Sequence, residues 1–136
     1  MMNRRIFTAA PTLLALAAVA LAGQAQAQAS HYPQRAVKLV VPYAPGGSAD
    51  IAARLISAEW AKALGSEMFI ENRAGAGGNL GVDSVAKSAP DGYTIGLQTV
   101  SLAINPALFP KMPFNTLKDL APIGMVASSQ HVLVVG

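Results

Sequence analysis

The stretch VVPYAPGGSADI, residues 40–51, joins an apolar run to an amphipathic one through a turn with two prolines and two glycines. The prolines fix φ and remove N–H donors, whereas Gly46 and Gly47 lack the Cβ atom that would keep a ligand away from the backbone. A helix that begins at Ser48 or Asp50 directs its free N–H groups and the positive end of its dipole into this turn. The turn therefore suits an anion, most simply a carboxylate.

The segments on either side of this turn are typical of a strand and a helix. Residues 37–41 are apolar except for Lys38, as expected for a strand buried on both faces of a parallel sheet. Residues 48–64 carry apolar side chains at three- and four-residue spacing, and Gly65 ends the pattern. The stripe predicted to pack on the sheet consists of Ala52, Leu55, Ile56, Trp60, Ala63 and Leu64.

The same alternation continues along the chain. A second strand is predicted at residues 68–71, followed by a second glycine-rich turn at 72–81 and a short helix at 80–86. A Pro-Asp-Gly turn at residues 89–92 then leads to a third strand at 93–97. The order β-α-β-α-β predicts parallel strands, right-handed crossovers and an α/β fold.

Two Gly-Gly pairs, at residues 46–47 and 77–78, each lie between a strand and a helix. In an open α/β sheet both turns fall at the carboxyl edge of the strands, where ligands bind. We therefore expect two backbone-lined anion sites side by side.

The pattern is looser after the third strand. Residues 99–101 are expected to leave the sheet, and Asn105-Pro106 to begin a short helix. Residues 116–120 are expected to form a helical turn with Asn115 or Thr116 as its cap. Residues 123–127 and 132–135 have the composition of strands.

The N-terminal segment, residues 1–27, is typical of a secretory signal. Two arginines precede an apolar, alanine-rich run, and cleavage after Ala27 is favoured over cleavage after Ala29. A membrane anchor is less favoured, because the run is short and contains Pro11. Arg4-Arg5-Ile6-Phe7 resembles a twin-arginine motif, but ordinary secretory export to the periplasm is the favoured route.

Composition narrows the classes of partner. The chain of 136 residues has no cysteine and a formal charge of +3. Arg4 and Arg5 lie in the signal segment, so residues 28–136 keep eight Lys and Arg residues against seven Asp and Glu residues, a net charge of +1. Basic clusters with interleaved aromatic residues are missing from the sequence, which argues against nucleic acid as a partner. No His or carboxylate spacing indicates a metal site, and no cofactor is expected.

Two catalytic or cofactor interpretations are weak. The second glycine run places Leu80 where a dinucleotide fingerprint needs its third glycine, and Gly81 comes one residue late. A hydrolase would have to use Ser48, His31 or His131, and the sequence around Ser48 is no nucleophile elbow.

Several polar residues near the turns admit more than one interpretation. Asp50 either complements the helix dipole alone, or orders the preceding turn, or contacts an amino or hydroxyl group of a ligand. Arg73 is either a carboxylate clamp or a solvated charge that closes a strand. Asn79, Thr99 and Ser101 either cap local structure or face a ligand at the sheet edge.

Six blocks of sequence carry a resemblance to a known family. They are YP at residues 32–33, VVPYAPGGSAD at 40–50, ENRAGAGGN at 71–79, APDGYT at 89–94, INPAL at 104–108 and KDLAPI at 118–123. In this order they resemble the substrate-binding proteins of tripartite tricarboxylate transporters, the Bug-type periplasmic receptors. Asn115-Thr116 departs from the family, which more often has Asp-Pro there.

The resemblance implies a monomeric receptor with the two-lobed, type II periplasmic binding protein fold. Such a receptor does no chemistry. It holds a small organic acid anion, partly through ordered water, and delivers it to membrane transporter subunits. The residues implied in binding are Tyr43, Ala44, Pro45, Gly46, Gly47, Ser48, Asp50, Ala76, Gly77, Gly78, Asn79, Thr99 and Ser101.

Family members are longer, so residues 28–136 are expected to form an incomplete N-terminal lobe, truncated before the second lobe. The alternatives to a transport receptor are a secreted α/β hydrolytic enzyme and a ligand-sensing partner of a membrane kinase.

Overall fold

The computed structural model describes residues 32–128 and 133–135. The chain splits into two units at Tyr32, and every helix and strand described belongs to the second unit, Pro33–Gly136. The elements are β1 (Val37–Val41), α2 (Ser48–Leu64), β2 (Met68–Asn72), η1 (Ala76–Gly78), α3 (Asn79–Ala86), β3 (Thr94–Gly96) and α4 (Ser101–Leu108). The predicted signal segment, His31 and His131 lie outside the described residues.

The three strands form one parallel sheet in the order β2-β1-β3. β1 is the central strand, with Val41 opposite Asn72 of β2 and Val40 opposite Gly96 of β3. Apart from Lys38, the side chains of β1 are buried, because strands flank β1 on both sides and helices cover both faces of the sheet. The predicted β-α-β-α-β order with parallel strands is confirmed.

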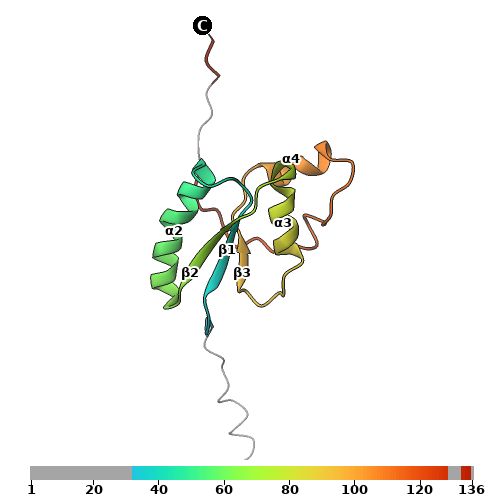
Figure 1. Cartoon of the computed structure of the whole chain (residues 1–136). Helices are drawn as coiled ribbons and strands as arrows, with labels where there is room; N and C mark the ends of the chain where they lie inside the picture. The colour runs from blue at the N-terminus through green and yellow to red at the C-terminus, as the bar shows by residue number, and fades with distance from the viewer. Residues whose placement is uncertain (1–31, 129–132, 136) are drawn as a thin grey trace, which may run out of the picture. The chain divides into compact units, whose positions relative to one another are not determined.

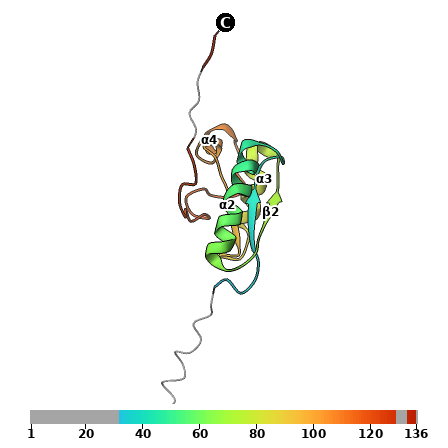
Figure 2. The same cartoon turned by 90° about the vertical axis from the view of Figure 1, so that its left-hand side faces the viewer.

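The two crossover helices cover opposite faces of the sheet (Figures 1 and 2). α2 packs on β1 and β2, whereas α3 packs on β1 and β3. The chain thus runs from β1 to one neighbour, and then back across β1 to the other. A reversal of this kind creates a switch point at the carboxyl ends of the strands, where ligands bind in open α/β sheets.

The buried face of α2 is rotated from the predicted one. Ala53 is buried in the core, and Ala49 and Ile56 pack beside it, whereas Leu55 is 69% exposed. The rotation follows from Asp50, three residues before Ala53 on the same helix face, which is held by hydrogen bonds beneath the first turn. A buried polar anchor therefore overrides the apolar stripe predicted from Leu55, Ala63 and Leu64.

α4 begins at Ser101, four residues before the predicted start at Asn105. Thr99 explains the earlier start, because its carbonyl accepts from the amide of Leu102 and its hydroxyl accepts from the amide of Ser101. Pro106 consequently lies inside the helix and not at its first turn.

The segment after α4 is irregular. A turn follows Asn115, whose side-chain oxygen accepts from the amides of Leu117 and Lys118, so the predicted cap at Asn115 is confirmed. Residues 123–127 form no strand, and the prediction there is wrong: Ile123 and Met125 are largely exposed and pair with no described strand. The described residues 133–135 of the last predicted strand also lack strand structure.

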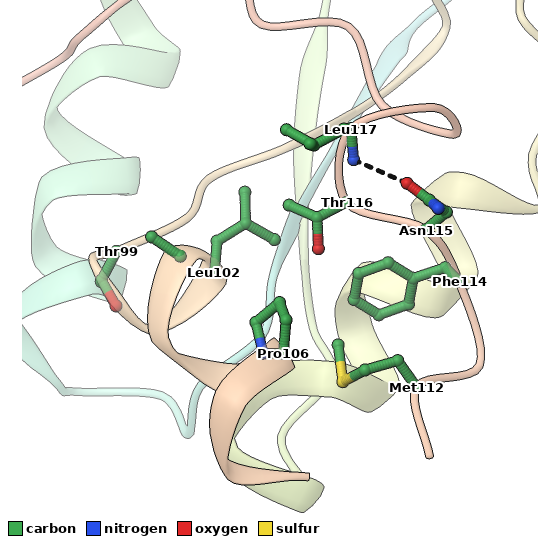
Figure 3. Close-up of a pocket in the computed structure, with 9 residues that line it drawn as sticks. Thr99, Leu102, Pro106, Met112, Phe114, Asn115, Thr116 and Leu117 are labelled. Carbon is green, nitrogen blue, oxygen red and sulfur yellow. Dashed lines mark hydrogen bonds between the residues drawn. The ribbon is translucent and has the colours of Figure 1, made fainter. Parts of the chain in front are cut away.

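A pocket of 740 Å³ lies between α4 and this irregular segment (Figure 3). Its lining includes Thr99, Leu102, Pro106, Met112, Phe114 and Thr116. Most of this lining is apolar, and the hydroxyl of Thr116 has no hydrogen-bond partner in the described part of the chain.

Candidate functional site at the carboxyl edge of the sheet

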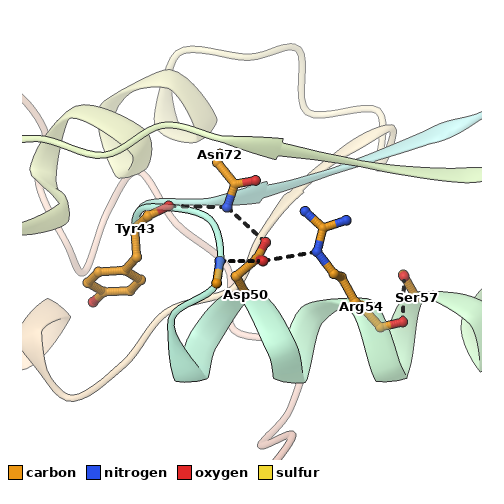
Figure 4. A network of polar contacts seen from close by, with 6 residues as sticks. Tyr43, Asp50, Arg54, Ser57 and Asn72 are labelled. Carbon is orange, nitrogen blue, oxygen red and sulfur yellow. Dashed lines mark hydrogen bonds and ion pairs between the residues drawn. The ribbon is translucent and has the colours of Figure 1, made fainter.

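The first turn, between β1 and α2, is organised by the carboxylate of Asp50. One of its oxygens accepts from the backbone amide of Gly46 and from Nε of Arg54, both at 2.9 Å. Its other oxygen accepts from Nδ2 of Asn72 at 2.9 Å, and the same nitrogen donates to the carbonyl of Tyr43. Figure 4 shows Asp50 at the centre of this network, so Asp50 orders the turn, which is one of the three roles predicted for it.

The network also fixes the charge of Asp50. The hydrogen bond from Arg54, with those from Gly46 and Asn72, holds the pKa of the Asp50 carboxyl well below its usual range, although burial opposes the shift. Asp50 in turn raises the pKa of Arg54. The residue is 2% exposed and remains ionised beneath the turn.

The first turn offers fewer backbone donors than its sequence suggests. The amide of Gly46 is already used by Asp50, so it is not available to an anion in this conformation. The amides of Gly47, Ser48 and Ala49 have no acceptor within the described residues, and no side chain caps this end of α2. These three amides are the donors that a helix N-terminus leaves open.

The second turn, residues 75–78, consists of four consecutive residues with positive φ. Ala76, with φ of 49°, is the exception to the rule that glycine occupies such positions, and a Cβ atom there costs about 1–2 kcal/mol. The amide of Gly78 donates back to the carbonyl of Gly75, while the amide of Gly77 has no acceptor in the described part of the chain. Strain retained in a turn is an indication of function.

The two turns touch, as the spacing of the Gly-Gly pairs predicts. A Cβ atom placed on Gly78 would lie 3.6 Å from the Tyr43 hydroxyl, and one on Gly81 would lie 2.6 Å from Cβ of Pro42. Gly81 thus lets α3 approach the first turn closely. The two turns lie side by side at one edge of the sheet.

Three hydroxyl groups join the first turn to the loop after β3. The Tyr43 hydroxyl lies 2.6 Å from the hydroxyls of both Thr99 and Ser101, which are 3.1 Å from each other. Hydroxyls both donate and accept, so this group can adjust its protons to a solute. The loops after all three strands therefore meet at the switch point of the sheet.

Two asparagines hydrogen-bond to the turns and fix their conformation, although the sequence did not assign them to the site. Asn72 holds the first turn through Tyr43 and Asp50. Asn105, which is 5% exposed, donates from Nδ2 to the carbonyl of Gly77 at 3.0 Å and to Oδ1 of Asn79 at 2.8 Å. Both lie inside the sequence blocks that carry the family resemblance, which was the only signal that could have identified them.

The predicted site residues fall into two groups. Exposed at the edge are Ala44, Pro45, Gly46, Gly47, Ser48, Ala76, Gly77 and Thr99, and Tyr43 and Ser101 are half-buried. Asp50, Gly78 and Asn79 are buried beneath them. The structure brings both groups together at one edge, and their contact with a solute stays a prediction.

The cations near this edge are paired with acids of the same unit. Arg54 pairs with Asp50, and Arg73 pairs through Nε with Glu71 at 2.6 Å. Glu71 also pairs with Lys38, which together with Arg73 lowers the pKa of the Glu71 carboxyl. The donors left open at the edge therefore include peptide amides and hydroxyls, and both arginines are already paired through Nε.

Other kinds of site receive no support from the described residues. They contain no group of three or more His, Cys, Asp or Glu side chains that could hold a metal ion. Within the same residues, no helix combines the length and the apolar character needed to span a membrane.

Comparison with known proteins gives consistent matches. Residues 52–136 match the family model described as tripartite tricarboxylate transporter family receptor. The chain is 44% identical to Protein BugT of Bordetella pertussis over 119 residues, which cover 85% of this chain and 36% of that protein.

Two solved structures have a similar fold. One, MatC from Rhodopseudomonas palustris with bound malate, is 43% identical, with a TM-score of 0.63 over 70% of this chain and 33% of that one. The other, the periplasmic binding protein BugD, is 36% identical, with a TM-score of 0.63 over 65% of this chain and 29% of that one. The chain thus has the α/β fold of part of a periplasmic binding protein, consistent with a single lobe, and spans about a third of the length of the relatives it matches. Sequence and fold agree that it belongs to the tripartite tricarboxylate transporter receptor family.

Proposed function

We propose that this protein is an extracytoplasmic solute-binding receptor, which captures a small carboxylate-bearing solute for a membrane transporter of the tripartite tricarboxylate type. The observation that carries the proposal is the meeting of three loops at the switch point of the sheet, where open backbone amides lie next to a cluster of hydroxyls. Groups of this kind bind a carboxylate without performing chemistry on it.

The relatives support the chemical class of the solute. The structure of MatC contains malate, a dicarboxylate. The family consists of receptors and not enzymes, which supports binding without turnover. Delivery to membrane transporter subunits, a periplasmic location reached through the secretory pathway, and a monomeric state are parts of the same proposal.

A binding screen tests this function. Residues 32–128 of this chain would replace the matching residues of BugT, because the chain spans 36% of that protein. Thermal shift and calorimetry would then be run against mono-, di- and tricarboxylates. A shift without product formation supports the receptor, whereas turnover of a ligand, followed by chromatography, would favour the hydrolytic alternative and contradict the proposal.

A pair of tyrosine variants locates the binding site. Tyr43→Phe removes the hydroxyl that bridges two loops, and it should weaken carboxylate binding by roughly tenfold, the value of one lost hydrogen bond to a charged group. Tyr93→Phe is the matched control, since Tyr93 precedes β3 at the opposite edge of the sheet. Equal effects of the two variants would place the site elsewhere.

A further inference from the structure

We propose that Asn105 is a positioning residue, which fixes the side-chain amide of Asn79 so that its nitrogen donates to an acceptor oxygen of the solute. Asn105 has this role only if the edge holds a solute, as proposed above.

The backbone carbonyl of Gly77 determines the orientation of both amides. A carbonyl oxygen only accepts, so the atom of Asn105 that faces it at 3.0 Å must be Nδ2. The same nitrogen lies 2.8 Å from the side chain of Asn79, which must therefore present its oxygen, Oδ1. The Nδ2 group of Asn79 occupies the other arm of its amide and has no acceptor within the described residues.

An open donor at the edge is available to an acceptor from outside. Asn79 is 4% exposed, and its Nδ2 group does not belong to the buried polar atoms that lack a partner in the described part of the chain, so this group reaches solvent. Asn79 also directly follows Gly78, where an added Cβ atom would lie 3.6 Å from the Tyr43 hydroxyl. The geometry thus gives Asn79 the place and the free N–H groups needed to bind a solute carboxylate.

α4 connects this arrangement to the rest of the edge. Ser101 and Asn105 lie four residues apart on the helix, and therefore on the same face. Ser101 contacts the hydroxyl of Tyr43 in the first turn, while Asn105 holds the second turn through Gly77. One short helix thereby sets both turns and the orientation of Asn79.

A double-mutant cycle tests whether Asn105 acts through Asn79. Binding of malate to the chain is followed by NMR chemical shifts, which measure weak affinities, in Asn105→Ala, Asn79→Ala and the double variant. Each single change should weaken binding by roughly tenfold, and the double variant should be no weaker than Asn79→Ala alone. If the effect of Asn105→Ala persists unchanged in the Asn79→Ala background, Asn105 is merely structural and the proposal is wrong.

A second variant reverses the amide without changing its size. In Asn105→Asp the carboxylate can only accept, so Asn79 should turn its nitrogen inward and its oxygen toward the solute, and malate binding should fall by roughly 100-fold. Leu108→Ala, at an exposed position of the same helix, is the control and should leave binding unchanged.

The side-chain NH₂ signals of Asn79 keep the test independent of malate. They should move in Asn105→Ala and stay in Leu108→Ala, even without a solute. If the unaltered chain fails to bind malate but these signals move as expected, the proposed solute class is at fault, whereas the orientation of Asn79 by Asn105 stands. If they do not move, the positioning role is refuted.

Discussion

At the scale of single residues, Gly81 shows why the two turns can meet. It lies inside α3, where alanine would normally be favoured over glycine by about 1 kcal/mol. A Cβ atom there would nevertheless lie 2.8 Å from the carbonyl oxygen of Arg73, which follows β2, and 2.6 Å from Cβ of Pro42 in the first turn. Steric exclusion therefore outweighs helix propensity at this position.

Gly81→Ala should destabilise the protein by about 1–3 kcal/mol, because the two turns have to separate to admit the methyl group. The free energy of unfolding in urea measures the effect. Gly124→Ala is the matched control, since no atom lies within 4 Å of the added Cβ there, and it should change stability little. A stabilised Gly81→Ala variant would mean that the turns do not touch in solution.

Asp50 predicts a dependence of stability on acid. Its pKa is lower in the folded chain than in the unfolded one, so its contribution is complete above the ordinary carboxyl value of about 4 and is lost as the pH falls toward the folded value. The folded pKa of Glu71 is shifted in the same direction. Unfolding free energies measured between pH 7 and pH 2 should therefore decline below about pH 5.

Asp50→Asn should be less stable at pH 7 and should decline less steeply in acid, because the Arg54 and Gly46 contacts lose the negative charge that strengthens them. Glu59→Gln, which alters an exposed ion pair with Lys62 on the same helix, is the control for loss of an acid. Parallel pH curves for Asp50→Asn and the unaltered chain would contradict this role.

At the scale of elements, β1 is the strand on which the fold depends. Leu39 is 1% exposed, and Leu39→Ala should cost about 2–5 kcal/mol of unfolding free energy. The same replacement at Leu55 removes an exposed side chain from α2 and should change stability by less than about 0.5 kcal/mol. Comparable losses of stability at the two positions would show that Leu55 is buried, as the sequence predicts, and would contradict the observed rotation of α2.

The elements also show what sequence could and could not predict. The strand at residues 37–41 and the turn at 42–47 could be predicted, since local apolar runs and Gly-Pro chemistry determine them. The rotation of α2 could not, because it depends on the contact of Asp50 with Asn72, 22 residues away. The start of α4 could not be predicted either, because it depends on the hydroxyl of Thr99. The role of Asn105 depends on its contacts with Gly77 and Asn79, which lie 28 and 26 positions earlier in the sequence.

At the scale of the whole molecule, the proposed solute site is lined on one side by the described residues. The chain spans about a third of the length of its relatives, and the edge described above is open to solvent at Ala44, Ser48 and Gly77. A site enclosed on one side leaves the solute hydrated, and the affinity per contact is correspondingly small.

The 136-residue chain should therefore bind malate at least about 100-fold more weakly than the BugT chimera, because the chimera adds the surface that would enclose the solute. Calorimetry on the two proteins under the same conditions measures the difference. Tight binding by the 136-residue chain alone would show that these residues suffice to hold the solute.

The pairing of Arg54 and Arg73 with their own acids has a kinetic consequence. Long-range attraction that speeds the encounter of a charged solute needs unbalanced charge, and this edge carries little of it. Asp50 balances Arg54, whereas Glu71 is shared by Arg73 and Lys38, which leaves one positive charge. A carboxylate would reach this edge by ordinary diffusion and would interact with the peptide N–H dipoles only at short range. Ionic strength should then have only a small effect on how quickly this edge meets its solute and on how readily it releases it.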